Sequence, residues 1–260
     1  MTDTAVRGSS AGYQDGAARE RFFTPRRFIT PLIVAVVLGA LVLWLSSLQL
    51  DSIEKRTLNI DYIINRTREH LGLTIVASAL VAILAIPTGI ALSRTKSKVV
   101  RGIVLGIANI GQATPAIGVI ILLAIVWQTG YATALTALVI YSFLPVLRNT
   151  LIGLQQVDEN VRESARGMGM TPNQVLRDVE LPLAVPVILA GLRVAAVTVI
   201  SITVVAAYVN AGGLGTIIFA GMSNDHTPKI WVGALAACGL SVGVDLLLSA
   251  VETRARRSTR

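Results

Sequence analysis

Long runs of apolar residues alternate with short polar segments along the chain, and few charges interrupt the runs. An α-helix rises about 1.5 Å per residue, so about 20 apolar residues cross the roughly 30 Å hydrocarbon core of a bilayer. Six runs reach that length, at residues 31–50, 71–93, 103–127, 131–153, 184–208 and 230–251. This pattern predicts an all-α membrane protein with about six transmembrane helices.

The first run has a second interpretation, as the hydrophobic part of a secretory signal peptide. Its 20 residues at 31–50 exceed the usual length of about 7–15 residues for that part. No cleavage site of small residues follows it cleanly. We therefore expect an uncleaved N-terminal transmembrane helix.

The composition supports the membrane assignment. Of the 260 residues, 53% are hydrophobic and 15% are charged, whereas a soluble domain carries about 25% charged residues. This balance excludes a soluble globular domain, and it excludes a disordered chain, which needs low hydrophobicity. The single cysteine, Cys238, rules out an intrachain disulfide, and we expect it to be a small buried side chain.

The basic residues gather in alternate polar segments, and this distribution predicts an orientation. The formal net charge of +8 would suggest nucleic-acid binding in a soluble protein. Here Lys and Arg lie mainly in 1–30, 94–102, 154–183 and 252–260, and basic segments stay on the cytoplasmic side of a membrane. We expect both termini to be cytoplasmic and no nucleic-acid partner. Segment 51–70, with four basic residues, departs from this rule.

The polar segment before the fifth run has the features of two short helices. Asp158 is a suitable N-cap for the first helix, and Gly167 and Gly169 end it. The sequence T-P-N-Q at 171–174 is a capping box with proline at the first helical position. We expect the second helix to stop before Pro182, because a residue preceding proline disfavours the helical conformation.

This segment resembles the cytoplasmic coupling loop of type I ABC importer permeases. In that family the loop reads E-A-A, three residues, G, nine residues and I-x-L-P. The spacing here matches at every step, with Ser164 in place of the first Ala and Val179 in place of Ile. The residues that carry the resemblance are Glu163, Ser164, Ala165, Gly167, Gly169, Val179, Leu181 and Pro182.

Two further motifs resemble one branch of that family. The sequence A-G-G-L-G at 211–215 and the sequence Q-A-T-P at 112–115 are similar to permeases that import glycine betaine, choline, carnitine or proline. An amino-acid permease of the methionine type is the alternative within the family. The glycines at 212–215 would form either a tight outer turn, which we favour, or part of the region where a receptor docks.

The resemblance implies a domain organisation and a set of partners. An ABC transmembrane type-1 domain would occupy 66–251, with the coupling loop at 158–183, an extra helix at 31–50 and basic tails at 1–30 and 252–260. The loop would dock on a cytoplasmic ATPase subunit. A second permease chain and an extracytoplasmic substrate-binding protein would complete the importer in a bacterial cytoplasmic membrane. The alternative is a solvated loop that only joins two helices.

The chain lacks the sequence features of an enzyme. No G-x-x-x-x-G-K-[ST] phosphate loop occurs, and no arrangement of serine, histidine and acid suggests catalysis. We expect no catalytic residue, metal site or cofactor on this chain, and the resemblance places ATP and Mg²⁺ on the partner ATPase. His70 and His226 are too far apart for a metal-ligand pattern, so we expect His70 to be a solvated interface residue.

Polar residues inside apolar runs are candidates for function, because they are costly in hydrocarbon. Those of the third run either line a translocation path or form interhelical hydrogen bonds; they are Asn109, Gln112, Thr114 and Pro115. Arg193 and Asp245 lie at similar depths in antiparallel spans, which predicts an ion pair, whereas Arg148 is expected to extend to the inner interface. The rival from another class is an ion-coupled secondary transporter, which only Asp245 supports.

Overall fold

The computed structural model describes residues 59–258 and five isolated positions before them, 32, 36, 39, 40 and 43. The predicted tail at 1–30 lies outside the described residues, and so does most of the predicted helix at 31–50. The residues from 59 to 258 form helices and no strands. In chain order the elements are α3 (Ile60–Arg94), α4 (Lys98–Ala113), α5 (Ala116–Val126), α6 (Tyr131–Gln155), α7 (Glu159–Gly167), α8 (Pro172–Gln174), the π-helix η1 (Val175–Glu180), α9 (Leu181–Thr203), the 3-10 helix η2 (Val205–Val209), α10 (Gly215–Ser223) and α11 (Thr227–Ser258).

Four helical stretches are long and apolar enough to cross a membrane. They are Ile60–Arg94, Tyr131–Gln155, Pro172–Thr203 and Thr227–Ala255, and the pair α4 and α5 adds a fifth if it counts as one broken span. The prediction of an all-α membrane protein is therefore confirmed. The prediction of about six spans is not confirmed, because the described residues supply four or five.

The predicted span at 103–127 is not one straight helix. The axes of α4 and α5 differ by 98° across the break. Thr114 there is extended, with φ −74° and ψ 139°, because the ring of Pro115 disfavours the helical conformation in the residue before it. Pro115 then becomes the N-cap of α5. A proline inside the apolar run thus changes the direction of the chain by about a right angle.

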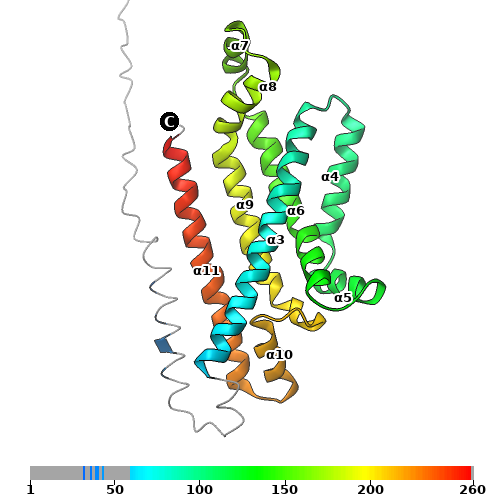
Figure 1. Cartoon of the computed structure of the whole chain (residues 1–260), viewed down its shortest axis with the longest axis vertical. Coiled ribbons are helices and arrows are strands. Elements are labelled where there is room, and N and C mark those ends of the chain that lie inside the picture. Colours follow the sequence, from blue (N-terminus) through cyan, green and yellow to red (C-terminus); the bar gives the residue numbers. More distant parts are fainter. Residues whose placement is uncertain (1–31, 33–35, 37–38, 41–42, 44–58, 259–260) are drawn as a thin grey trace, which may run out of the picture.

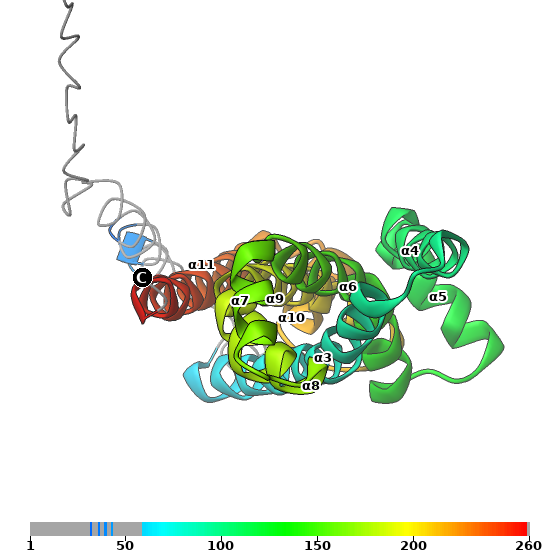
Figure 2. The same cartoon turned by 90° about the horizontal axis from the view of Figure 1, so that it is seen from above.

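Helix α6 is the centre of the bundle and packs against both α9 and α3. Seen along the bundle, α4 and α5 lie on one side of these three helices and α11 lies on the opposite side (Figure 2). Glycines allow the close approach: a Cβ on Gly191 would lie 2.6 Å from the Cβ of Asn149, and one on Gly89 would lie 2.7 Å from the Cβ of Thr150. Small residues at such crossings let helix backbones pack tightly in membranes.

Helix α11 lies at the edge of this bundle, and one sequence expectation for it is wrong. Cys238 is exposed in this chain instead of buried, because the extensive contacts of α11 are with α9 and α10 only. Residues 252–258, which belong to the predicted basic tail at 252–260, continue the helix to Ser258.

The predicted helix stop before Pro182 is wrong. The chain stays helical from Pro172 to Thr203, with the π-helical turn η1 immediately before the proline. The N–H of Leu181 donates to the carbonyl of Leu176, five residues back, instead of four. This wider turn makes room for the ring of Pro182, which would clash with the preceding turn of an α-helix. Helix α8, η1 and α9 are therefore one continuous helical rod.

Candidate functional site

Helix α7, with α8 beside it, forms one tip of the molecule, at the end opposite α10 (Figure 1). Asp158 caps α7 by accepting a hydrogen bond from the N–H of Asn160 at 2.9 Å. At the other end Gly169 has φ +86°, a left-handed conformation that glycine adopts without strain. Asp158 thus begins the helix and Gly169 follows its end, as the sequence predicts. Helix α7 lies between α6 and the α8–α9 rod in the chain.

Most residues of the E-S-A-x₃-G motif face away from the protein. Ala165 is buried, at 2% exposure, and is the one buried residue of α7. Glu163, Ser164 and Gly167 are exposed, and nothing lies within 4 Å of a Cβ built on Gly167 or Gly169. Met168 is 74% exposed. The motif therefore presents a small-residue surface with an apolar side chain at its edge, open to a partner.

Ion pairs along α7 stiffen the helix. Glu159 accepts hydrogen bonds from Arg162 at 2.7 Å and from Arg166 at 3.2 Å. The hydrogen bond from Arg162 is the main reason why the pKa of the Glu159 carboxyl lies below its ordinary value. The first turn of α7 therefore carries a carboxylate at neutral pH, where the positive end of the helix dipole favours it.

The second half of the motif lies at the junction of η1 and α9. The predicted capping box is present, with Thr171 and Gln174 bonded to each other's backbone N–H. Val179 and Leu181 are half-buried and Pro182 is exposed. Between Val179 and Leu181 lies Glu180, which is only 1% exposed.

Glu180 was missed by the sequence reasoning, because it occupies the unspecified position of I-x-L-P. Its carboxylate accepts from both terminal nitrogens of Arg94 at the end of α3, with Nη1 at 3.3 Å. Nε of Arg162 on α7 lies 3.2 Å from the same carboxylate. A charged residue between the apolar Val179 and Leu181 was the sequence feature that could have indicated Glu180. Its partners, however, are 86 and 18 residues away in the chain.

Arg193 and Asp245 are brought together between α9 and α11. Nε and Nη2 of Arg193 donate to the two carboxylate oxygens of Asp245 at 2.6 and 2.8 Å. Nη1 also donates to Glu252 at 3.3 Å. The geometry is a two-bond fork, the strongest form of a charged hydrogen bond. Glu252 was not predicted as a partner.

The four polar residues of the third run lie around the α4–α5 break. Asn109 is exposed and accepts from Arg148 on α6 at 3.5 Å. Gln112 and Thr114 are half-buried and Pro115 is exposed. Thr114 donates its hydroxyl to the carbonyl of Ile110, within its own helix. The structure therefore gives Asn109 an interhelical contact and gives Thr114 a local one.

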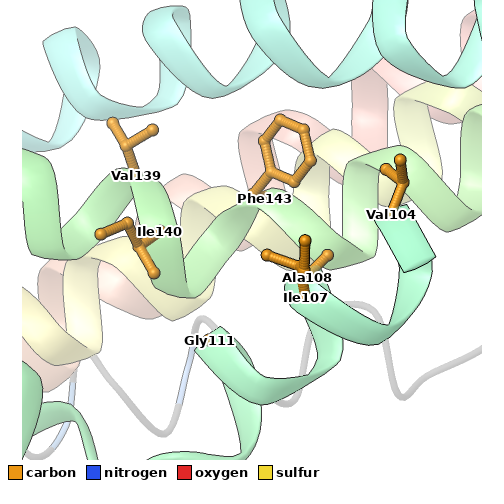
Figure 3. A pocket seen from close by; sticks show the side chains of 7 residues that line it. All are labelled: Val104, Ile107, Ala108, Gly111, Val139, Ile140 and Phe143. Carbon is orange, nitrogen blue, oxygen red and sulfur yellow. The ribbon is translucent and has the colours of Figure 1, made fainter.

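A groove of about 260 Å³ runs between α4 and α6 beside these residues (Figure 3). It is lined by Val104, Ile107, Ala108, Gly111, Val139, Ile140 and Phe143. Its lining is apolar, so the predicted polar residues do not converge on it. The groove is therefore not a polar binding site.

At the opposite end, the glycine segment 212–215 forms a tight turn held against α3. The N–H of Gly213 donates to Glu69 at 2.9 Å, and Gly212 and Gly213 have φ +83° and +86°. His70 is fully buried there and bonded through both ring nitrogens. The expectation that His70 is a solvated interface residue is wrong, because the turn covers it.

The described residues contain no group of three or more His, Cys, Asp and Glu side chains placed to hold a metal ion. The two described histidines lie apart, His70 under the glycine turn and His226 near the start of α11.

Curated proteins with similar sequences are permeases. The choline transport system permease protein OpuBB of Bacillus subtilis is 36% identical over 189 residues, which cover 73% of this chain and 86% of that protein. The carnitine transport permease protein OpuCB of Listeria monocytogenes is 39% identical over 189 residues, with the same coverage. The osmoprotectant import permease protein OsmW of Salmonella typhimurium is 35% identical, covering 78% of this chain and 96% of that protein.

Solved structures with the same fold include two transporters. The fold is similar to a chain of the MetNI methionine ABC transporter in an inward-facing conformation, with a TM-score of 0.63, 22% identity and coverage of 79% of this chain and 99% of that one. It is also similar to an amino acid ABC transporter crystallised with histidines, with a TM-score of 0.64, 21% identity and coverage of 80% and 100%. These likenesses establish the fold.

A family description, binding-protein-dependent transport system inner membrane component, matches residues 85–257. The match includes α6, the whole motif of α7 to α9, and α11. It agrees with the resemblance drawn from the coupling-loop motif. The chain therefore belongs to the binding-protein-dependent transport system inner membrane component family, the permease subunits of ABC importers.

Proposed function

We propose that this chain is the membrane-spanning subunit of an ATP-driven importer of a quaternary-amine osmoprotectant, such as choline, carnitine or glycine betaine. The observation that carries the proposal is the exposed E-S-A-x₃-G surface of α7 at one tip of a membrane-spanning bundle. The names of three relatives, at 35 to 39% identity, support the cargo class.

Helix α7 is the proposed contact for a cytoplasmic ATPase subunit. Small exposed residues such as Ser164 and Gly167 permit close approach of a partner surface. The chain carries no phosphate loop, so ATP and Mg²⁺ belong on that partner. With α7 on the cytoplasmic side, the basic C-terminal end of α11 lies on that side too, and we assign the N-terminus to it by the charge of 1–30.

The remaining partners follow from the small size of the bundle. Four or five spans are few to enclose a translocation pathway, so a second permease chain, identical or related, would face this one. Only 5% of the residues are aromatic, and aromatic faces are the usual cage for a quaternary ammonium. Cargo selection is therefore assigned to an extracytoplasmic binding protein, with the complex in a bacterial cytoplasmic membrane.

Two rival functions have less support. Methionine import rests on a structural likeness at 22% identity, which establishes the fold alone. Ion-coupled transport needs a carboxylate free to bind a cation, whereas Asp245 is engaged by both donor nitrogens of the Arg193 fork.

Reconstituted vesicles test the proposal. The permease with its ATPase subunits and binding protein is expected to accumulate radiolabelled choline, carnitine or glycine betaine only when ATP is supplied. Methionine serves as the competing cargo, and a proton or sodium gradient without ATP serves as the competing energy source. Accumulation driven by the gradient alone, or of methionine alone, would overturn the proposal.

A further inference from the structure

The end of the bundle that carries α7 is joined at one buried carboxylate. Glu180 is 1% exposed, and its two oxygens face Arg94 of α3 and Arg162 of α7. Arg162 also donates to the carbonyl of Leu154, in the last turn of α6. Four elements, α3, α6, α7 and η1, therefore meet in one network, in which Arg94 forms hydrogen bonds with Glu180 and Arg162 forms an ion pair with it.

Glu180 and Arg94 each lie at the end of a helical element, so the network connects α7 mechanically to two membrane-spanning helices. Glu180 is the last residue of η1, and η1 continues into α9 without a break. Arg94 is the last residue of α3. Helix α7 has few other attachments to the bundle, since Ala165 is its one buried residue. A displacement of α7 therefore reaches α3 and α9 through Glu180.

The charges give the network its stiffness. Hydrogen bonds between ionised groups are shorter and about twice as strong as neutral ones, and burial weakens screening by water and salt. Arg162 is also held from its other side by Glu159 at 2.7 Å, so its guanidinium has little freedom to turn. An apolar contact at this position would resist separation of the helices but would not fix their direction.

We propose that Glu180 is the positioning residue that transmits the movement of α7 to the membrane-spanning helices. The inference rests on the proposed function, because α7 moves only if an ATPase subunit binds it. Glu180 touches neither cargo nor nucleotide and acts through Arg94 and Arg162. Its loss should disconnect ATP hydrolysis from transport instead of abolishing hydrolysis.

The test compares uptake per ATP hydrolysed in vesicles that contain the full complex. Glu180→Gln keeps the side-chain shape and removes the charge. We expect it to lower glycine betaine or choline uptake per ATP by about fivefold or more, the lower end of usual coupling factors, while ATP hydrolysis continues. Asp178→Asn is the matched control, since Asp178 is an exposed acid of the same π-helical turn, and should leave the ratio unchanged.

Three further variants separate positioning from simple destabilisation. Arg94→Lys and Arg162→Lys keep the charge and lose the planar fork, so each should give an intermediate ratio. Glu180→Gln combined with Arg162→Gln should be no worse than Glu180→Gln alone. If Glu180→Gln fails to assemble, the two lysine variants supply the measurement.

The outcomes are distinguishable from failure of the proposed function. If the unaltered complex accumulates neither quaternary amine with ATP, the proposed function is wrong. If the unaltered complex accumulates one of them and Glu180→Gln or both lysine variants show the same uptake per ATP, the role of Glu180 is wrong. A ratio that falls equally in Asp178→Asn would also overturn it, because the effect would then follow any charge loss in η1.

Discussion

The Nδ1 atom of His70 accepts a hydrogen bond from the backbone N–H of Leu214 at 3.3 Å, across 144 residues of sequence. Its Nε2 atom lies 3.0 Å from the carbonyl of Ile200. A carbonyl only accepts, so Nε2 carries the proton and the ring is the neutral tautomer. One buried side chain thus satisfies backbone groups at the end of α9 and in the glycine turn.

Replacing His70 with leucine should loosen the glycine turn. The substitution leaves the Leu214 N–H and the Ile200 carbonyl without their partner, and each unsatisfied buried group costs about 1–3 kcal/mol. We expect a lower thermal midpoint of the detergent-solubilised protein and faster amide exchange at residues 212–216. Arg68→Leu, at an exposed position two residues earlier, is the control. Unchanged exchange in the His70 variant would show that the turn does not depend on the ring.

Gly212→Ala should destabilise the same turn for a different reason. Its φ of +83° is strained for any residue with a Cβ, and that Cβ would lie 2.6 Å from the Glu69 carboxylate. A strained backbone position of this kind costs about 1–3 kcal/mol. The matched substitution is Gly72→Ala, in helix α3 with nothing within 4 Å of the new Cβ, which should be neutral or stabilising. Equal thermal midpoints for the two variants would contradict the prediction.

Substitutions at Gly169 and Gly167 should act for different reasons, the first through backbone conformation and the second through a blocked surface. Gly169→Val is expected to abolish uptake, because φ +86° excludes a β-branched residue, and Gly169→Asn should retain activity, since asparagine tolerates this conformation. Gly167→Trp should leave the thermal midpoint unchanged, because Gly167 is exposed and no neighbouring element lies within 4 Å of a Cβ built on it. It should nevertheless weaken binding of the ATPase subunits in a pull-down. Unchanged binding by Gly167→Trp would count against α7 as the docking surface.

The Arg193–Asp245 fork should show up in a double-mutant cycle. Arg193→Leu and Asp245→Leu each leave a charged partner in an apolar environment, so the double variant should be more stable than the sum of the single losses predicts. We expect an interaction energy of about 1–3 kcal/mol, measured by thermal unfolding in detergent. Additive single effects would mean that the fork adds no stability.

The helical fold and the two short helices α7 and α8 could be predicted from local signals. Apolar runs of sufficient length predicted the long helices, and capping residues such as Asp158 and Thr171 predicted where α7 and α8 begin. These signals are local, because a cap or a run acts on the backbone within a few residues. The spacing of its residues was also sufficient to match the E-S-A-x₃-G motif to its family.

Other features depended on contacts between distant residues. Pro115 and Pro182 are both prolines in apolar surroundings, yet one turns the chain by 98° and the other is absorbed in a π-helical turn. Local propensity does not decide between a bend and a wider turn, because packing of the flanking helices sets the cost of each. The burial of His70 likewise depends on a turn 144 residues away.

From the sequence alone came the class of protein, its apolar spans and the segment that we propose as a docking surface, because hydropathy, capping and motif spacing are properties of neighbouring residues. The tertiary structure decided which charges meet. Glu180, in the unspecified position of its motif, became the junction of α3, α6 and α7 only when folding brought Arg94 and Arg162 to it. A buried charge needs partners that the chain supplies from distant segments, and only the packed helices determine which residues those are.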